Sequence, residues 1–273
     1  MPLTSIIDCH THSTFSPDSA MSLKEGVIAA HAHGLGGLTF TDHIELAHPD
    51  TVTWKTPFDI KSRSQCIDEL RQECCGAYNI KIFKGLELGF QPTIVERAST
   101  LIKQNDFDFV MLSTHVVDDI DLGGTPFYEG KTKKQAYKKY LDTIYESVSM
   151  FDDFDVVGHI GYACRYAPYP DKSLSHVDYQ DELDAILTRV ISKGKGIEVN
   201  TAGFRHNLGC PHPDFDILKR YKELGGTIIT IGSDAHSTPR IGSQFEVVVQ
   251  RLADLGFAHV TYFENRVPVF VKI

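Results

Sequence analysis

Short β-rich runs alternate with amphipathic helical stretches along most of the chain, and this alternation limits the possible folds more than any other feature. Such alternation predicts a parallel sheet whose strands are joined by crossover helices. A chain of 273 residues is long enough for an α/β barrel built as one unit, so we expect one domain over residues 1–273. The seven expected strands are Ser5–Cys9, Gly37–Thr41, Ile80–Leu88, Phe107–Ser113, Phe154–Gly158, Gly196–Asn200 and Thr227–Gly232.

Helix signals lie between these runs. Ser22 followed by Glu25, and Thr132 followed by Gln135, are capping boxes that predict helix starts. An apolar face after Ser175 predicts a further helix, which ends near Gly194. The remaining expected elements are helices over Ile60–Tyr78 and Pro213–Leu224, one helix after Gly242, and a hairpin-like tail over Val260–Ile273.

Four insertions follow strands of the expected barrel. In such barrels the loops after the strands build the active site at one end. We therefore expect the site to be formed by the insertions Ile44–Asp59, Val117–Lys131, Tyr162–Ser173 and Thr201–Pro213.

Histidine is frequent, with 13 in the chain, and many lie where an expected strand ends. His10 and His12 are two positions apart on extended chain, so their imidazoles point the same way. A single histidine at a strand end is commonly an ordinary polar residue, but chance does not account for the whole set. A His or carboxylate ends successive strands at His10 and His12, Asp42 and His43, Glu87, His115, His159, and Asp234 and His236.

Composition excludes several functions. With 36 acidic and 27 basic residues the net charge is −9, which argues against a general nucleic-acid binder and against binding to anionic membranes. The sequence has no readable signal peptide and no run of about 18 apolar residues, so we expect a cytoplasmic protein. The cysteines lack CxxC spacing, and we expect reduced thiols at Cys9, Cys66, Cys74, Cys75, Cys164 and Cys210.

The strand-end motifs resemble those of the PHP (polymerase and histidinol phosphatase) superfamily, and are most similar to its histidinol-phosphate phosphatase branch. The resemblance runs from Asp8 to His236. It rests on Asp8-Cys9-His10-Thr11-His12, Thr41-Asp42-His43, the His115 segment and Gly232-Ser233-Asp234-Ala235-His236. It implies a single distorted (β/α)7 TIM-like barrel, which agrees with the number of strands expected from the pattern.

The resemblance also implies a trinuclear metal site. The first metal would be held by His10, His12, Glu87 and Asp234, the second by Glu87, His115 and His159, and the third by Asp18, His43 and His236. Asp8 and Asp42 would then orient imidazoles rather than bind metal. Imidazole and carboxylate ligands suit two or three divalent ions of Zn, Mn or Fe, and the sequence does not choose among them.

The activity implied by the resemblance is hydrolysis of L-histidinol phosphate to histidinol and phosphate, a step of histidine biosynthesis. A metal-bridging hydroxide would attack phosphorus. The expected catalytic residues are Glu87, which bridges two metals, and Asp234 or His236, either of which would protonate the leaving oxygen. Arg165 and Arg205 lie in the rim loops and are expected to bind the phosphate through their planar guanidinium groups.

Two alternatives remain open at this stage. One is a phosphoesterase for nucleoside or other small phosphates, because the same metal site serves several substrates in the superfamily. The other is a metal-binding regulatory module without turnover. The expected partner is a small phosphorylated substrate, with no nucleic acid and no membrane, and the sequence predicts no particular oligomeric state.

Overall fold

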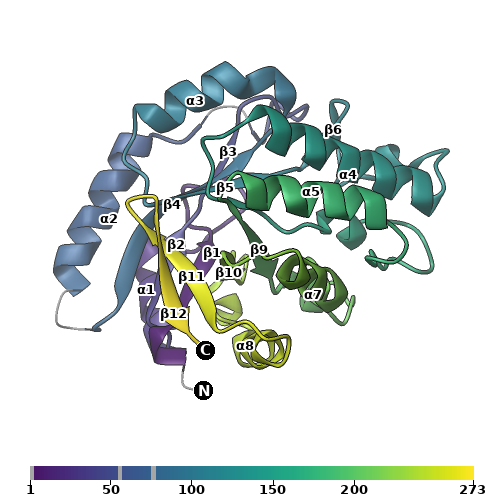
Figure 1. Cartoon of the computed structure of the whole chain (residues 1–273). Coiled ribbons are helices and arrows are strands. Elements are labelled where there is room, and N and C mark those ends of the chain that lie inside the picture. The colour runs from purple at the N-terminus through teal and green to yellow at the C-terminus, as the bar shows by residue number, and fades with distance from the viewer. Residues whose placement is uncertain (1–2, 55–56, 75–77) are drawn as a thin grey trace.

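Parallel strands alternate with helices to form a nearly closed barrel in the computed structural model, which describes residues 3–54, 57–74 and 78–273 (Figure 1). The strand order is β1-β2-β4-β5-β8-β9-β10, and every neighbouring pair on this path is parallel. The seven predicted strands are thus confirmed. They are β1 Ile7–Thr11, β2 Gly37–Phe40, β4 Lys81–Gly89, β5 Phe109–Ser113, β8 Val156–Val157, β9 Gly196–Asn200 and β10 Ile229–Gly232.

The last strand returns to the first at the end where the site lies. Thr11 and Ala235 form an isolated parallel bridge. The His12 amide donates to the Ala235 carbonyl over 2.9 Å, and the Asp234 amide donates to the His10 carbonyl over 2.8 Å. These bonds join the histidine motif after β1 to the Asp234 motif after β10.

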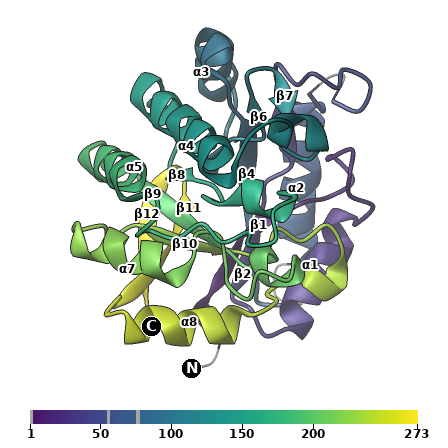
Figure 2. The same ribbon diagram turned by 90° about the vertical axis from the view of Figure 1, so that its right-hand side faces the viewer.

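Helices surround the strands as an outer ring (Figure 2). Ser22 and Thr132 form the predicted capping boxes at the starts of α1 and α4. The helices of the ring are α1 Leu23–Ala32, α2 Ile60–Cys74, α3 Val95–Lys103, α4 Lys133–Met150, α5 Gln180–Ser192, α7 Phe215–Glu223 and α8 Phe245–Asp254. Of the helix predicted to reach Tyr78, residues 75–77 lie outside the described residues, as does Cys75.

Helix α3 was not predicted. It has no side-chain cap at Ile94, and only Ala98 and Ile102 on it are buried. Its nine residues are fewer than the roughly 11 to 18 over which a helical period is recognised, and no side-chain cap marks where the helix begins.

A C-terminal hairpin closes the end of the barrel where the strands begin. Strands β11 (His259–Glu264) and β12 (Val267–Lys272) pair antiparallel, as the tail pattern predicted. Tyr262 and Phe263 pack in a buried cluster with side chains from the barrel interior, including Ile7, Phe83 and Phe109. Apolar side chains therefore fill the end of the barrel where the strands begin, so a functional site must lie at the end where the strands finish.

The rim at that opposite end carries small elements that the sequence pattern did not predict. Strand β3 (His43–Glu45) pairs parallel to β4, and β6 (Val116–Val117) forms a hairpin with β7 (Ile120–Asp121). A helix of one turn, α6 (Ala202–Arg205), follows β9. Runs of two to four residues are too short to show a period.

Two further sequence predictions concern the whole chain. The described cysteines, Cys9, Cys66, Cys74, Cys164 and Cys210, are free thiols. Within the described ranges, every helix is too short or too polar to cross a membrane.

Candidate metal centre

The predicted ligands converge at the ends of the strands. They come from seven places in the chain that are distant in sequence but adjacent around the barrel. His10 lies in β1 and His12 just after it, Asp18 in the following loop, His43 at the start of β3, Glu87 in β4, His115 after β5, His159 after β8, and Asp234 and His236 after β10.

Glu87 lies at the centre of this cluster and is 1% exposed. Its Oε2 is 3.0 Å from His10 Nε2 and 3.1 Å from His43 Nδ1. Its Oε1 is 2.8 Å from His159 Nε2 and 3.2 Å from His115 Nε2. Oε2 also lies 3.4 Å from His12 Nε2, so the two oxygens face different sets of imidazoles, as a bridging carboxylate would.

Asp234 closes the His10–His12 side of the cluster. Its Oδ1 is 3.6 Å from His12 Nε2 and 3.8 Å from His10 Nε2. Its backbone has a positive φ of 54°, a left-handed conformation that is uncommon outside glycine. Arg205 holds this turn, because its Nη1 and Nη2 donate to the carbonyls of Ser233 and Asp234 over 2.7 and 2.9 Å.

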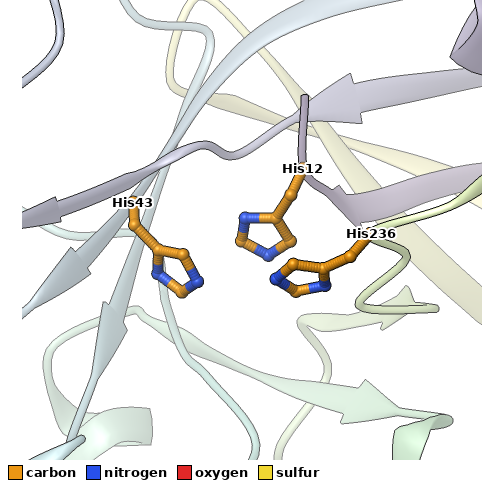
Figure 3. Close-up of side chains that lie close together, drawn as sticks. All are labelled: His12, His43 and His236. Carbon is orange, nitrogen blue, oxygen red and sulfur yellow. The ribbon is translucent and has the colours of Figure 1, made fainter. Parts of the chain in front are cut away.

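Three of the imidazoles lie close together (Figure 3). The His12 ring lies 4.3 Å from that of His43 and 4.1 Å from that of His236, and both pairs are stacked. Asp18 Oδ2 is 3.1 Å from His236 Nε2 and 3.6 Å from His43 Nε2. The structure therefore brings the predicted ligands into one cluster, and its close groups of ligand atoms cut across the three sets that the resemblance implied, since His43 lies with Glu87 and His115 as well as with His12 and His236.

The pKa shifts divide the ligands of this cluster into two sets. Burial raises the pKa of Glu87, but the His10 and His43 imidazoles lower it more, so the net pKa is well below its ordinary value. Burial, together with the nearby His236 and His43, lowers the pKa of His12 to about 3, and burial also lowers the pKa of His159.

Burial lowers the pKa of His10 and of His115 too, but Glu198 and Glu45 raise it more, so the net pKa of both is well above the ordinary value. Glu87, His12 and His159 are therefore in the forms that bind cations, and His10 and His115 would release a proton when a cation binds.

The donor set fits divalent transition metals. His12, His43 and His236 form one group whose ligand atoms lie within 4.8 Å of one another. The other such groups are His10 with His12 and Asp234, His10 with Glu87 and His159, and His43 with Glu87 and His115. His10 Nε2 and His12 Nε2 are only 3.0 Å apart, and a cation beside them would relieve the repulsion of their lone pairs. Imidazole and carboxylate suit Zn, Mn or Fe.

Two glutamates that the sequence reasoning missed orient the imidazoles. Glu198 Oε1 lies 2.6 Å from His10 Nδ1, and Glu45 Oε1 lies 2.6 Å from His115 Nδ1. Each fixes its ring so that Nε2 faces Glu87. A carboxylate behind a ligating imidazole also makes the imidazole more basic.

The prediction that Asp8 and Asp42 orient imidazoles is wrong for Asp8, and Asp42 contacts an imidazole only through another side chain. Asp8 accepts hydrogen bonds from the backbone amides of His10, Ser233 and Gly242, and so fastens chain segments rather than rings. Asp42 reaches an imidazole only through Ser16, whose Oγ donates to Asp42 Oδ1 over 3.1 Å and lies 3.2 Å from His12 Nδ1. An aspartate side chain is short, and at both positions it accepts hydrogen bonds from nearby backbone amides and contacts no imidazole directly.

Asp42 also pairs with an arginine that is completely buried. Arg63 Nε in α2 donates to Asp42 Oδ2 over 2.6 Å, and both side chains are 0% exposed. Arg63 also donates to the Phe40 carbonyl at the end of β2. Burial raises the pKa of Asp42, but Arg63 and His12 lower it more, so Asp42 remains ionised. This pair connects the helix ring to the histidine motif.

The two predicted phosphate-binding arginines differ in position. A cavity of about 270 Å³ lies over the cluster and is lined by Arg165, whereas Arg205 is outside its lining. Arg165 Nη2 contacts Asp234 Oδ2 over 2.8 Å, while its buried Nε has no hydrogen-bond partner among the described residues. Arg165 therefore lies where a bound phosphate would be, and Arg205 acts on the turn that carries Asp234.

We predict that Glu198→Gln lowers metal affinity by about 10- to 100-fold, because glutamine keeps the shape but removes the charge behind His10. Elemental analysis after dialysis against graded chelator measures this loss. The matched control is Glu246→Gln on the exposed surface of α8, which should retain metal like the parent protein. Equal metal retention by both variants would show that Glu198 has no part in the centre.

Comparisons with known proteins agree with this geometry. The PHP domain family matches residues 8–202. A histidinol-phosphatase of Lactococcus lactis is 34% identical over 235 residues, which are 86% of this chain and 85% of that protein. A probable histidinol-phosphatase of Clostridium acetobutylicum is 30% identical over 261 residues, which are 96% of this chain and 98% of that protein.

A solved structure is similar over nearly the whole length. The crystal structure of histidinol phosphate phosphatase from Lactococcus lactis, complexed with zinc, L-histidinol and phosphate, superposes with a TM-score of 0.88 at 32% identity. The match covers 97% of this chain and 99% of that one. The similarity therefore extends beyond the residues matched by the family and includes the Asp234 motif and the C-terminal hairpin.

Proposed function

This chain belongs to the PHP domain family, and from that premise we propose that it is a metal-dependent phosphomonoesterase that hydrolyses L-histidinol phosphate to L-histidinol and phosphate. The observation that carries the proposal is the cluster of imidazoles around Glu87, which lies under a cavity in a chain similar throughout to a phosphatase solved with zinc, L-histidinol and phosphate. We also propose that residues 1–273 form one domain.

We propose that the centre holds two or three divalent ions of Zn, Mn or Fe, in the three ligand groups given by His10, His12, Glu87 and Asp234, by Glu87, His115 and His159, and by Asp18, His43 and His236. Bound divalent ions would lower the pKa of water and neutralise phosphate charge. Their charge exceeds that of the three ligand carboxylates, so the centre attracts a phosphate although the chain as a whole carries −9.

The side chains of this protein would position the phosphate and supply a proton. Arg165 lies on the cavity wall, and its contact with Asp234 keeps the guanidinium in place beside the proposed phosphate position. Arg205 uses two of its guanidinium N–H groups on the Ser233 and Asp234 carbonyls, and its remaining N–H groups would make it the second phosphate contact.

Asp234 and His236 both line the cavity and are the two candidates to give a proton to the leaving oxygen. His236 is favoured, because Asp18 raises its pKa against the effect of burial, whereas Arg165 and His10 hold the pKa of Asp234 well below its ordinary value although burial raises it.

The proposal is tested with a panel of phosphomonoesters assayed on purified, metal-loaded protein. We expect the highest kcat/KM for L-histidinol phosphate among that substrate, a nucleoside monophosphate, glycerol phosphate and p-nitrophenyl phosphate. A higher value for the nucleotide or glycerol phosphate would refute the substrate assignment. Metal-loaded protein that releases phosphate from none of them would refute the enzyme assignment and leave a metal-binding regulatory module.

A further inference from the structure

One carboxylate in the cavity is not used by the metal centre. Among the described residues that line the cavity, three acidic side chains, Asp18, Glu87 and Asp234, belong to the proposed ligands, and Glu45 is engaged by His115. The fifth is Asp121, at the end of β7 in the rim hairpin. Its side chain is 44% exposed, so it lies at the mouth of the cavity rather than at the floor.

The Asp121 carboxylate is held in place from one side. Its Oδ1 accepts a hydrogen bond from the Gly123 amide over 2.7 Å. Its Oδ2 lies 3.9 Å from Nε2 of His48, which also lines the cavity. His48 Nδ1 accepts from the Asp50 amide over 3.1 Å, so the proton of a neutral His48 is on Nε2, toward Asp121.

Aromatic rings form the walls between Asp121 and the metal ligands. Trp54 lies 5.1 Å from His43 and 5.4 Å from His48, measured between ring centroids, and Tyr162 lies 4.9 Å from His115. Both rings line the cavity. The faces of Trp and Tyr attract cations.

The cavity is therefore polarised. The guanidinium of Arg165 lies 4.9 Å from the Tyr162 ring centre, next to Asp234, and gives this side positive charge. Asp121 and the aromatic rings make the mouth favourable to a cation. A substrate with an anion at one end and a cation at the other matches both regions in one orientation only.

We propose that Asp121 is a specificity residue that binds the protonated amine of the substrate, with Trp54 and Tyr162 beside it, while the phosphate lies at the metal centre. The inference rests on the proposed function, because L-histidinol phosphate carries both a phosphate and an amine that is protonated at neutral pH. Phosphomonoesters without a cationic group gain nothing from Asp121.

The test compares two substrates in Asp121→Asn. Asparagine keeps the size of the side chain and the acceptor for Gly123, and removes only the charge. A hydrogen bond to a charged group accounts for about a 10- to 150-fold loss, so we expect kcat/KM for L-histidinol phosphate to fall about that much, mainly through KM. For p-nitrophenyl phosphate, kcat/KM should stay within about twofold. L-Histidinol should also inhibit hydrolysis of p-nitrophenyl phosphate more weakly in the variant, by a similar factor.

The matched control is Asp119→Asn, which removes the same charge from an exposed position two residues away and should leave both substrates unaffected. Equal losses for both substrates in Asp121→Asn would overturn the inference, because they would show a structural role. An unchanged KM for L-histidinol phosphate would overturn it as well. Failure of the proposed function is seen separately, as a parent protein that does not prefer L-histidinol phosphate to p-nitrophenyl phosphate.

Discussion

Glu87→Gln is expected to lower kcat/KM for L-histidinol phosphate by about 10²- to 10⁴-fold and to reduce bound metal at two of the proposed positions. The reason is that the two carboxylate oxygens face different imidazoles: His10, His12 and His43 on one side, and His115 and His159 on the other. Removing one partner from a buried charged set costs about 3–5 kcal/mol, and every 1.4 kcal/mol is a tenfold change in rate.

Steady-state kinetics and elemental analysis on the same preparation measure both effects. Glu96→Gln, on the exposed face of α3, is the matched control and should behave like the parent protein. If Glu87→Gln retained full metal content and full rate, the bridging role would be wrong. Loss of rate with full metal content would assign Glu87 to catalysis but not to metal binding.

Arg63→Met is expected to lower the free energy of unfolding by about 3–5 kcal/mol at neutral pH. The side chains of Arg63 and Asp42 are both 0% exposed. Methionine fills a volume similar to that of arginine but leaves the buried Asp42 carboxylate without its cation. Urea denaturation measures the loss. Arg97→Met on the exposed face of α3 is the control and should change stability by less than about 0.5 kcal/mol.

The loss of stability in Arg63→Met should become smaller as the pH falls. In the parent protein the pKa of Asp42 is lowered, so its ionised form stabilises the fold above the unfolded pKa, and this contribution is lost as pH falls through the folded pKa. In Arg63→Met, burial without the cation raises the pKa of Asp42. Acidification should therefore narrow the stability difference between the two proteins. A difference that widens as pH falls from 7 to 5 would contradict the pairing.

Much of the centre could be predicted because its ligands sit where strands end. Parallel strands deliver their carboxyl ends to one rim, so His10, Glu87, His159 and Asp234 had to meet once the seven strands were recognised. The two-residue spacing of His10 and His12 added their common direction. The capping boxes at Ser22 and Thr132 fixed two helix starts by local hydrogen bonds alone.

The supporting glutamates were harder to find, for different reasons. Glu198 lies in a wholly buried strand, Gly196–Asn200, two positions before Asn200, and a carboxylate inside such an apolar run is a signal that could have been used. Glu45 lies in a strand of three residues, which is too short to show the alternation of apolar and polar residues that predicts the direction of a side chain. Its contact with His115 depends on the pairing of β3 with β4, which is a tertiary feature.

The central claim is that hydrolysis of L-histidinol phosphate depends on metal bound at this centre. The most direct test measures phosphate release in one preparation before metal removal, after chelation, and after return of zinc or manganese. The account predicts rapid release at first, release at the background rate once the metal is gone, and recovery when it is returned. Release that continues unchanged after elemental analysis shows the protein to be free of metal would contradict it.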